Sequence, residues 1–299
     1  MVDKYVGGAI LSPPDPRDYT VGSALEVAGD TLPQAWETWQ PPVEKQGQIG
    51  NCVAQSLANI MECIDHHSEQ EHRDWSVGYI YGKSSVAAYS GMIPRDACDV
   101  LVKEGDVLRS VWECLEENPA CWEKRFFVSE DIKAQAQRVK MYVRLYTEDE
   151  AKRFMLKYNL PVMVCVDVQK VYGPMFGDGK HALIWFGWDD SKRKFYKYNH
   201  KYVGDNLHLQ DSQGTGGMWG DGTRWANFDD FEEVWGIVPN EKITFPDVED
   251  SRWSAASIRE AVEDGIFVGF EDGTFRPEEP LTREQAAAFY KRLKTAFGK

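Results

Sequence analysis

Apolar residues in the first half of the chain recur at the spacing of helices. After a glycine-containing loop at 46–51, they line one face of a predicted helix: Val53, Leu57, Ile60, Met61 and Ile64. Asn51 stands at the N-cap position of this helix, which puts Cys52 in its first turn. Three further helices are predicted downstream, at 76–90, 94–103 and 148–158.

The second half of the chain changes to strand patterns. Short apolar or alternating runs between Gly- and Asp-containing turns predict strands at 162–168, 181–188, 194–198 and 207–210. Helices followed by strands predict an α+β domain built in two halves. We place this domain at 41–240, because residues 1–40 are rich in Pro, Gly and Asp and fit an extended segment.

Residues 245–299 form a third part with a different texture. They follow a break near 239–244 and carry two predicted helices, at 255–264 and 282–296, joined by glycine-containing loops. No second copy of this unit occurs in the chain. We therefore expect a small separate module after the α+β domain.

Charge and hydropathy remove several classes of function. The net charge of −14 over 299 residues repels phosphate backbones and argues against a nucleic-acid partner. No apolar run reaches the roughly 18 residues of a membrane helix, so no membrane partner is expected. The first residues lack the apolar stretch of a secretory signal. Three explanations stay open: a leader that was trimmed, function where the protein is made, or release by cell lysis.

The cysteines narrow the chemistry further. No pair among the six has CxxC spacing, so a metal site is not supported. No cofactor is expected either, because a nucleophilic cysteine needs only to be a reduced thiol. Cys63, Cys98 and Cys165 lie in apolar helix or strand patterns and fit buried positions. Cys114 and Cys121 could pair in an oxidising compartment.

Cys52 differs from the other cysteines because it stands at a helix N-terminus. The positive end of the helix dipole lowers a thiol pKa, and a nearby imidazolium lowers it further, which favours the nucleophilic thiolate. Acyl transfer also requires hydrogen-bond donors for the developing oxyanion. The side-chain amide of Gln46 can fold back across the loop as one donor, and the backbone N–H of Cys52 is the natural second.

The base for such a thiol should be a histidine elsewhere in the chain. His181 opens an apolar strand directly after a glycine-rich loop, where an imidazole can face a cleft. His208, in a short strand, is the alternative base. The remaining histidines fit exposed or turn positions: His66, His67, His72 and His200.

These residues lie in motifs that resemble those of papain-like (C1-type) cysteine peptidases, in the family's order and spacing. Four segments carry the likeness: the nucleophile motif at 46–52, the substrate-cradling stretch at 90–94, the His strand at 181–188, and a segment at 209–216 similar to the family's Asn-Ser-Trp-Gly. The likeness covers about 15–240, and the opening residues 14–19 resemble a bacterial or phage branch.

The resemblance implies a fold of two lobes, one helical with the Cys-bearing helix and one an antiparallel, barrel-like β lobe. It implies Cys52 as nucleophile, His181 as its base, Asp211 as the residue that orients the imidazole, and Gln46 as the oxyanion donor. The implied activity is hydrolysis of peptide or protein substrates through a thioester acyl-enzyme.

The same resemblance implies the substrate contacts. Gly91 and Met92 would offer backbone hydrogen bonds to an extended peptide, and Ile93 and Pro94 would border an apolar side-chain pocket. Trp219 would wall the leaving-group side.

The chain departs from the family pattern at several points. Asp211 stands where the family has Asn; a carboxylate still orients a histidine, but it also raises the pKa of the imidazolium. Gln213 replaces a Trp that shields the orienting hydrogen bond, and Met92 replaces a Gly. The N-terminal 40 residues are shorter than the usual inhibitory propeptide, so any latency is expected to depend on other means.

Residues 245–299 resemble one S-layer homology module. The matching segments are 245–248, 265–269, 272–277 and 281–285, together with Trp253. In that family such residues help bind anionic cell-wall polysaccharide, which implies Asp247, Trp253 and Arg283 as glycan contacts and an extracellular or cell-wall location. Because one module has a marginal core, we expect self-association into a trimer or docking on the peptidase; an appendage that binds no glycan is the alternative.

Two other functions fit the same residues. A catalytically inactive papain-like scaffold that only binds would account for Asp211 and Gln213. A cell-wall peptide hydrolase using Cys and His would account for the C-terminal module. The upstream Gln46 and the order of Cys52 before His181 favour the cysteine peptidase.

Overall fold

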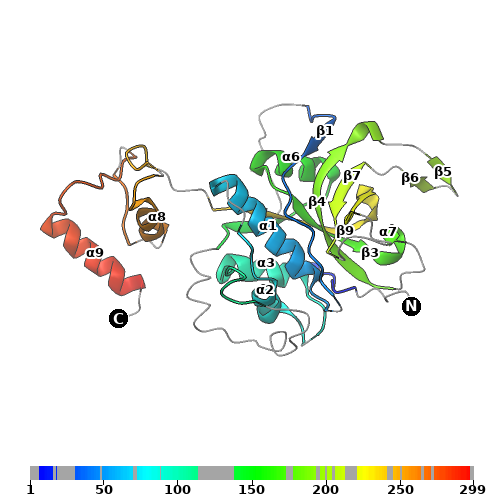
Figure 1. Cartoon of the computed structure of the whole chain (residues 1–299), viewed down its shortest axis with the longest axis horizontal. Coiled ribbons are helices and arrows are strands. Elements are labelled where there is room, and N and C mark those ends of the chain that lie inside the picture. Colours follow the sequence, from blue (N-terminus) through cyan, green and yellow to red (C-terminus); the bar gives the residue numbers. More distant parts are fainter. Residues whose placement is uncertain are drawn as a thin grey trace. The chain divides into compact units, whose positions relative to one another are not determined.

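The chain divides into two units, residues 1–240 and 241–299 (Figure 1). The computed structural model describes residues 7–15, 18, 31–47, 49–69, 73–87, 89–113, 138–172, 178–192, 196–198, 201–203, 206–212, 221–240, 245–249, 251–263, 266–270 and 273–296. Within these ranges, no helix has the length and apolar character needed to cross a membrane.

Three helices come first in the larger unit: α1 (Cys52–Glu69), α2 (Val77–Ser84) and α3 (Pro94–Lys103). α1 confirms the predicted Cys-bearing helix, and Asn51 stands at its N-cap position, where its carbonyl accepts the Gln55 N–H at 2.9 Å. The buried Asn51 Oδ1 has no hydrogen-bond partner among the described residues, so the side chain adds no capping bond. α2 begins where the Ser76 hydroxyl accepts the Tyr79 N–H, and it is shorter than the predicted 76–90. α3 starts with Pro94, whose fixed φ suits the first turn.

A seven-stranded sheet forms the second part of this unit. Its strands are β1 (Ala35–Glu37), β2 (Met141–Arg144), β3 (Val162–Asp167), β4 (Lys180–Asp189), β7 (Leu207–Gln210), β8 (Thr223–Ala226) and β9 (Phe231–Val238). They lie in the order β2-β9-β3-β4-β7-β8, with β1 also on β4, and the described pairings are antiparallel. β5 (Tyr196–Tyr198) and β6 (Lys201–Val203) pair antiparallel in a separate two-stranded sheet. The predicted strands thus correspond to β3, β4, β5 and β7.

Two helices flank β3 in the sequence: α6 (Glu148–Tyr158) and α7 (Val168–Tyr172). α6 has a complete capping box, in which Thr147 and Glu150 each bond the backbone N–H of the other. It ends at Asn159, whose left-handed φ of 52° stops the helix. Short 3₁₀ turns at Asp190–Lys192 and Phe228–Asp230 precede β5 and β9.

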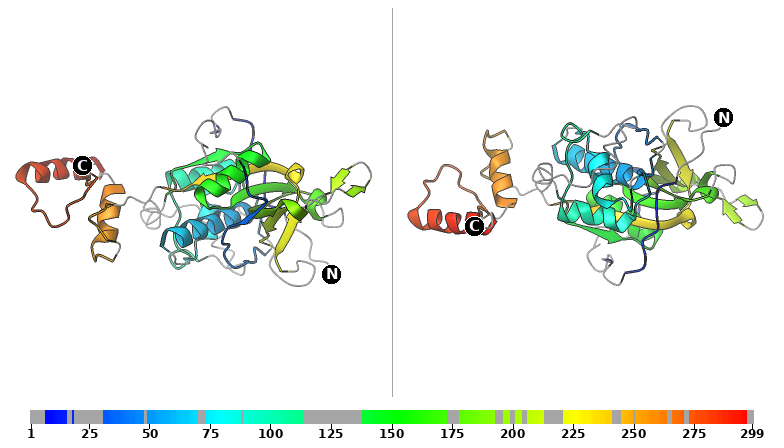
Figure 2. Two further views of the ribbon diagram at one scale, coloured as in Figure 1. Left: turned by 90° about the horizontal axis from the view of Figure 1, so that it is seen from above. Right: turned by 90° about the horizontal axis from the view of Figure 1, so that it is seen from below.

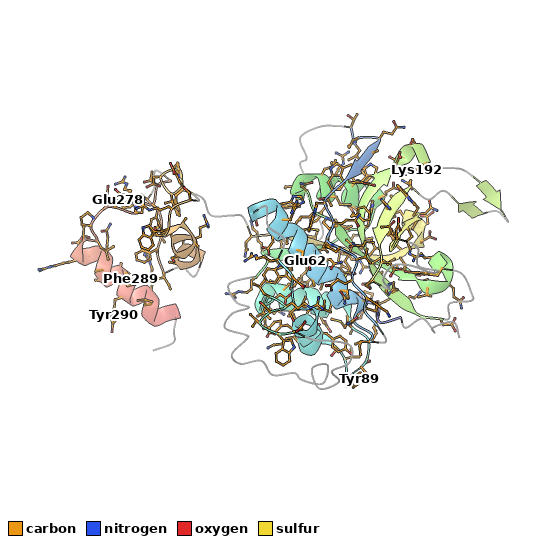
Figure 3. The ribbon with its side chains drawn as sticks, in the orientation of Figure 1. Glu62, Tyr89, Lys192, Glu278, Phe289 and Tyr290 are labelled. Atoms are coloured by element: carbon orange, nitrogen blue, oxygen red, sulfur yellow. The ribbon has the colours of Figure 1, made fainter. Side chains whose placement is uncertain are left out.

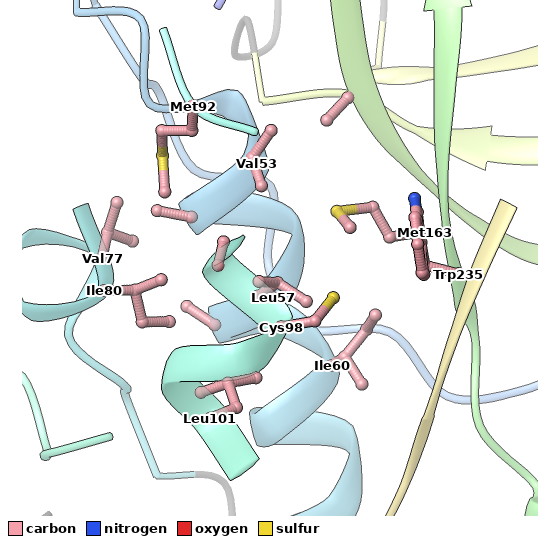
Figure 4. Close-up of a cluster of buried hydrophobic side chains, with 14 of the residues drawn as sticks. Val53, Leu57, Ile60, Val77, Ile80, Met92, Cys98, Leu101, Met163 and Trp235 are labelled. Atoms are coloured by element: carbon pink, nitrogen blue, oxygen red, sulfur yellow. The ribbon is translucent and has the colours of Figure 1, made fainter. Parts of the chain in front are cut away.

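The sheet buries a different core on each face, because side chains alternate along its strands. On one face, Met163 and Trp235 pack with Leu57 and its neighbours on α1, α2 and α3 (Figure 4). On the other, Val164 packs with Phe154 of α6. Figure 2 shows helices on both faces of the sheet. These two cores confirm the expected α+β architecture and fix α1 directly against β3 and β4.

The smaller unit contains α8 (Ala255–Glu263) and α9 (Arg283–Ala296), which confirm the two helices predicted there. Its core is small: Val248, Ala255 and Ile258, with Phe245 and Phe275 packed against them. On α9, Phe289 stacks on Phe267 with 4.8 Å between ring centroids, whereas the next residue, Tyr290, is 61% exposed (Figure 3). A cavity of about 510 Å³ is lined by both helices.

Candidate active site

Cys52 is the first residue of α1 and is fully buried. The backbone N–H of Ala182 points at its Sγ from 3.4 Å, and no acidic residue lies in the first turn of α1. Burial alone would raise the pKa of the Cys52 thiol. The charge and hydrogen bond of His181, helped by the N–H groups of Ala182 and Gly8, lower the pKa overall, and the helix dipole acts in the same direction.

His181 lies on β4, with its backbone opposite Val166 of β3. Its ring is fully buried, and Nε2 lies 3.0 Å from Oδ1 of Asp211. Burial disfavours the imidazolium, but the Cys52 thiolate and the Asp211 carboxylate outweigh it and raise the pKa of His181 to about 9. The structure therefore brings together the thiol, the imidazole and the carboxylate that the sequence singled out.

Asp211 directly follows β7 and is 1% exposed. Its second oxygen, Oδ2, accepts the Tyr172 hydroxyl at 2.5 Å and lies 2.9 Å from Nη2 of Arg224. Burial opposes ionisation, yet the His181 contact, the Arg224 charge and the Tyr172 hydrogen bond lower the pKa of Asp211 to about 2. The carboxylate is therefore charged at neutral pH and engaged on both oxygens.

Gln46 is buried in the loop before α1, and its side chain is held in a fixed orientation. Its Oε1 accepts the Ser212 hydroxyl at 2.7 Å, and its backbone N–H donates to the Ser212 carbonyl at 2.7 Å. Its Nε2 donates to the Ile49 carbonyl at 2.9 Å. An amide nitrogen has two hydrogens, so this contact uses one of the two N–H groups.

The predicted substrate-cradling stretch already holds an extended segment, residues 7–12 of the same chain. The Met92 N–H donates to the Gly8 carbonyl and the Met92 carbonyl accepts the Ile10 N–H, both at 2.8 Å. The Ala9 N–H donates to the Lys180 carbonyl at 3.1 Å, beside His181. Segment 7–12 therefore crosses the candidate site and occupies both backbone groups of Met92 that were expected to receive a substrate. The Gly91 carbonyl instead accepts the Val86 N–H at 3.2 Å.

Close backbone approach keeps segment 7–12 in this position. A Cβ on Gly8 would lie 2.4 Å from the Gly50 backbone, and one on Gly91 would lie 2.5 Å from the Gly8 carbonyl oxygen. Farther along, Ser12 donates its N–H at 2.6 Å and its hydroxyl at 3.1 Å to the buried carboxylate of Glu233. The two glycines are therefore required by the tight packing at this point.

The other predicted substrate residues are placed as follows. Ile93 is the N-cap of α3 and half-buried, and Pro94 is buried in the first turn of that helix. Trp219 lies outside the described residues, as does Gln213. In the smaller unit, Trp253 is 91% exposed.

The remaining two predicted glycan contacts differ from each other. Asp247 accepts the backbone N–H groups of Phe275 and Arg276 at 3.0 and 2.6 Å, so its carboxylate holds a loop of the module. Arg283 begins α9 and is exposed.

The other cysteines match the expectation of buried thiols where they are described. Cys63, Cys98 and Cys165 are buried and free, and burial raises the pKa of each. Cys114 and Cys121 lie outside the described residues. In the part of the chain that is described, no cluster of three or more His, Cys, Asp or Glu side chains could hold a metal ion.

The remaining histidines have other partners. His208, the alternative base, lies 2.8 Å from the Glu37 carboxylate and stacks on Trp225. His66 and His67 are half-buried, so their predicted exposure was wrong: His66 stacks on Trp39, and the ring of His67 contacts Thr38 and Asn159. His72 and His200 fall outside the described ranges.

Three residues of the site were not predicted from the sequence: Tyr172, Ser212 and Arg224. Ser212 lies inside the 209–216 motif, next to Asp211, and this position could have indicated that it belongs to the site. Tyr172 and Arg224 come from α7 and β8, and only the fold brings them to Asp211.

Comparison with solved structures identifies the fold of the larger unit. Xylellain, a cysteine protease from Xylella fastidiosa, is similar with a TM-score of 0.64 and 21% identity, over 80% of this chain and 97% of that one. A Carica candamarcensis cysteine protease in complex with E-64 has a TM-score of 0.51 and 16% identity, over 70% and 100%. Procathepsin B S9 from Trypanosoma congolense gives 0.55 and 15%, over 78% and 86%. The larger unit has the papain-like cysteine protease fold.

The smaller unit matches a different family. Residues 244–287 match the S-layer homology domain. A cellulosome-anchoring protein of Acetivibrio thermocellus is 46% identical over 55 residues, which are 18% of this chain and 12% of that protein. The chain thus aligns with only a small part of this curated relative, and carries an S-layer homology domain after its papain-like fold.

Proposed function

We propose that the chain is a cysteine peptidase in which the Cys52 thiolate attacks a peptide carbonyl and His181 protonates the leaving amine. The observation that carries this proposal is the buried row of Cys52, His181 and Asp211. In it the thiol pKa is lowered and the imidazole pKa is raised to about 9. Between these two pKa values the pair exists as thiolate and imidazolium, which are the nucleophile and the acid that amide cleavage needs.

The reaction proceeds in two halves. The bond from Sγ to the carbonyl carbon forms, the C–N bond breaks with the His181 proton passing to the amine, and a thioester is left on Cys52. Water then loses a proton to His181 and attacks the thioester, and Cys52 departs as a thiolate. The Cys52 backbone N–H and the Gln46 Nε2 are the proposed donors to the oxyanion in both halves, with Ser212 holding the Gln46 amide.

The substrate of this site is proposed to be an extended peptide. An extended backbone pairs with both the N–H and the carbonyl of Met92, and segment 7–12 makes these bonds in the free chain. It presents the Gly8 N–H to Cys52. A substrate must therefore displace segment 7–12, and we assign this segment the part of a built-in competitor for the cleft.

The C-terminal domain is proposed to attach the enzyme to cell-wall polysaccharide at the cell surface. The support is the S-layer homology match and the anchoring relative. Trp253 and Arg283 are the exposed contacts we assign to the glycan, because an arginine suits a carboxylate on such a polymer. Asp247 is assigned to holding the 275–276 loop instead of the glycan.

A cell-wall peptide hydrolase is the second candidate, favoured by this same domain. Digestion of casein and of isolated cell walls, run side by side, separates the two. Cleavage of casein alone supports a general peptidase, whereas cleavage of cell walls alone would move the substrate to wall peptides.

Labelling of the nucleophile tests the proposed chemistry. The reduced protein is treated with an epoxide-type thiol-protease inactivator, and the adduct is mapped by mass spectrometry. We expect selective labelling of Cys52, because the pKa of its thiol is lowered whereas burial raises the pKa of Cys63, Cys98 and Cys165. This labelling should be lost in His181→Ala. Labelling of Cys52 at the rate of an ordinary thiol would contradict the proposal and favour an inactive binding scaffold.

A further inference from the structure

Asp211 presents an electrostatic problem that an uncharged amide at this place would not. The carboxylate is 1% exposed and lies beside the imidazole. Burial of an anion is unfavourable unless it is paired and hydrogen-bonded, and its charge raises the pKa of a neighbouring imidazole. A carboxylate can orient His181 here only if another group compensates for its charge.

Arg224 supplies this compensation. Its Nη2 lies 2.9 Å from Oδ2 of Asp211, and its side chain is only 19% exposed. Arg224 lies on β8 opposite Leu209 of β7, two residues before Asp211, and the Asp211 N–H donates to the Gly222 carbonyl at 2.8 Å. The pairing of β7 with β8 therefore fixes the guanidinium beside the carboxylate.

Tyr172 completes the arrangement from α7. Its hydroxyl donates to Oδ2 of Asp211 at 2.5 Å, and its ring meets the His181 ring edge-on, with 6.1 Å between centroids. The guanidinium of Arg224 lies over the Tyr172 ring, 4.1 Å from its centroid. Tyr172 is thus in contact with His181, Asp211 and Arg224.

We propose that Arg224 and Tyr172 are positioning residues that allow a carboxylate to orient the catalytic imidazole. Arg224 balances the Asp211 charge, while Tyr172 fixes Oδ2 and covers the His181–Asp211 bond. This inference rests on the proposed peptidase function, because it concerns the same site. In the part of the chain that the structure describes, His181, Tyr172 and Arg224 face Asp211, and Cys52 lies beyond the imidazole.

The direction of the pKa change expected in each variant follows from the charge that the variant removes. Removal of the guanidinium leaves more net negative charge near Cys52 and His181, so the pKa of the thiol and of the imidazolium both rise. Removal of the carboxylate by Asp211→Asn has the opposite effect, because Arg224 then faces a neutral amide. When both are changed, the two shifts oppose each other and the local charge balance returns.

The test is a cycle of Arg224→Gln, Asp211→Asn and the double variant, with the full chain throughout. The pH dependence of Cys52 alkylation by iodoacetamide and of kcat/KM on a peptide is measured for each. We expect both limbs of the kcat/KM profile to move up by about one pH unit or less in Arg224→Gln and down in Asp211→Asn. The pH limbs of the double variant should lie near those of the parent, and its kcat/KM should exceed that of both single variants.

Further variants separate positioning from folding. Arg224→Lys keeps a charge and should retain the parent pH limbs even if kcat falls. Tyr172→Phe keeps the ring but loses the donor, so kcat should fall with KM little changed. Arg153→Gln, a change of an arginine in an exposed pair with Asp149, should leave every profile unchanged. Melting temperatures identify variants that are merely unstable.

Each failure has a distinct pattern. If the parent shows no activated Cys52, the peptidase proposal fails. If the parent is activated but Arg224→Gln lowers only the melting temperature and leaves both pH limbs unmoved, the positioning role of Arg224 is wrong. A double variant no better than the weaker single variant would also overturn it.

Discussion

At the scale of single residues, each charged group of the candidate site has a neighbour of opposite charge. Cys52 and His181 are fully buried, and Asp211 is 1% exposed. Isolated, each ion would be costly in such surroundings. Together they form an alternating row of thiolate, imidazolium, carboxylate and guanidinium, so no charge in this row lacks an opposite charge beside it.

The fixed amide of Gln46 leads to a prediction at this scale. Gln46→Ala should lower kcat by about 10²–10³-fold with KM little changed, because one oxyanion donor is lost. Ser212→Ala should lower kcat less, since it removes only the hydroxyl that holds Oε1. Steady-state kinetics on a peptide substrate measure both.

A matched control for Gln46 lies one turn into α1. Gln55 is also buried, and its Oε1 has no hydrogen-bond partner among the described residues. Gln55→Ala should affect stability more than kcat. An equal loss of kcat in the two glutamine variants would contradict the role assigned to Gln46.

At the scale of elements, helix and strand ends bring the chemistry together. Cys52 starts α1, His181 lies near the start of β4 and Asp211 directly follows β7. Contact of α1 with β3 and β4 joins the first two, and the pairing of β4 with β7 joins the last two. Segment 7–12 crosses the same place and links the Met92 backbone to that of Lys180.

Gly8→Ala tests whether segment 7–12 competes for the cleft. The new Cβ would lie 2.4 Å from the Gly50 backbone, so the segment should leave its position. We expect faster labelling of Cys52 by a peptide-sized inactivator and a lower KM for peptides. Pro14→Ala, at an exposed position farther along, is the control. Slower labelling in Gly8→Ala with an unchanged melting temperature would count against the competitor role.

Local pattern was enough to predict α1, α3, α6 and most central strands, because their apolar spacing is regular. It missed β9, whose Glu233 is buried in an apolar sheet by pairing with Arg144 at 3.1 Å and with the Trp235 indole N–H at 2.8 Å. In the sequence, a glutamate at this place is typical of an exposed position, because its partner Arg144 is distant in the sequence and only the fold brings the two together. Arg224 was missed for the same reason, whereas the motif residues Cys52 and His181 were predicted directly.

At the scale of the whole molecule, the chain joins a papain-like unit to an S-layer homology domain that has little core of its own. Among the residues of the domain that the structure describes, three apolar side chains are buried, and Leu281 and Tyr290 are more than half exposed. The chemistry proposed for the first unit uses no residue of the second. The two activities should therefore be separable.

A chain truncated after Asn240 tests this separation. We expect it to retain kcat/KM on a soluble peptide and to lose sedimentation with isolated cell walls, because the assigned glycan contacts lie beyond the cut. Trp253→Ala in the full chain should weaken sedimentation without changing peptide cleavage. If the truncated chain sediments as well as the parent, wall attachment belongs to another part of the protein.

The most direct test of the central claim is the rate of Cys52 alkylation by iodoacetamide as a function of pH. The pKa of Cys52 is lowered and that of His181 is raised to about 9. We therefore expect rapid alkylation already at pH 6.5, where an ordinary thiol of pKa about 8.5 is only ~1% ionised. His181→Ala should abolish this early reactivity. A single titration at or above the ordinary thiol pKa, unchanged in His181→Ala, would show that no thiolate–imidazolium pair exists.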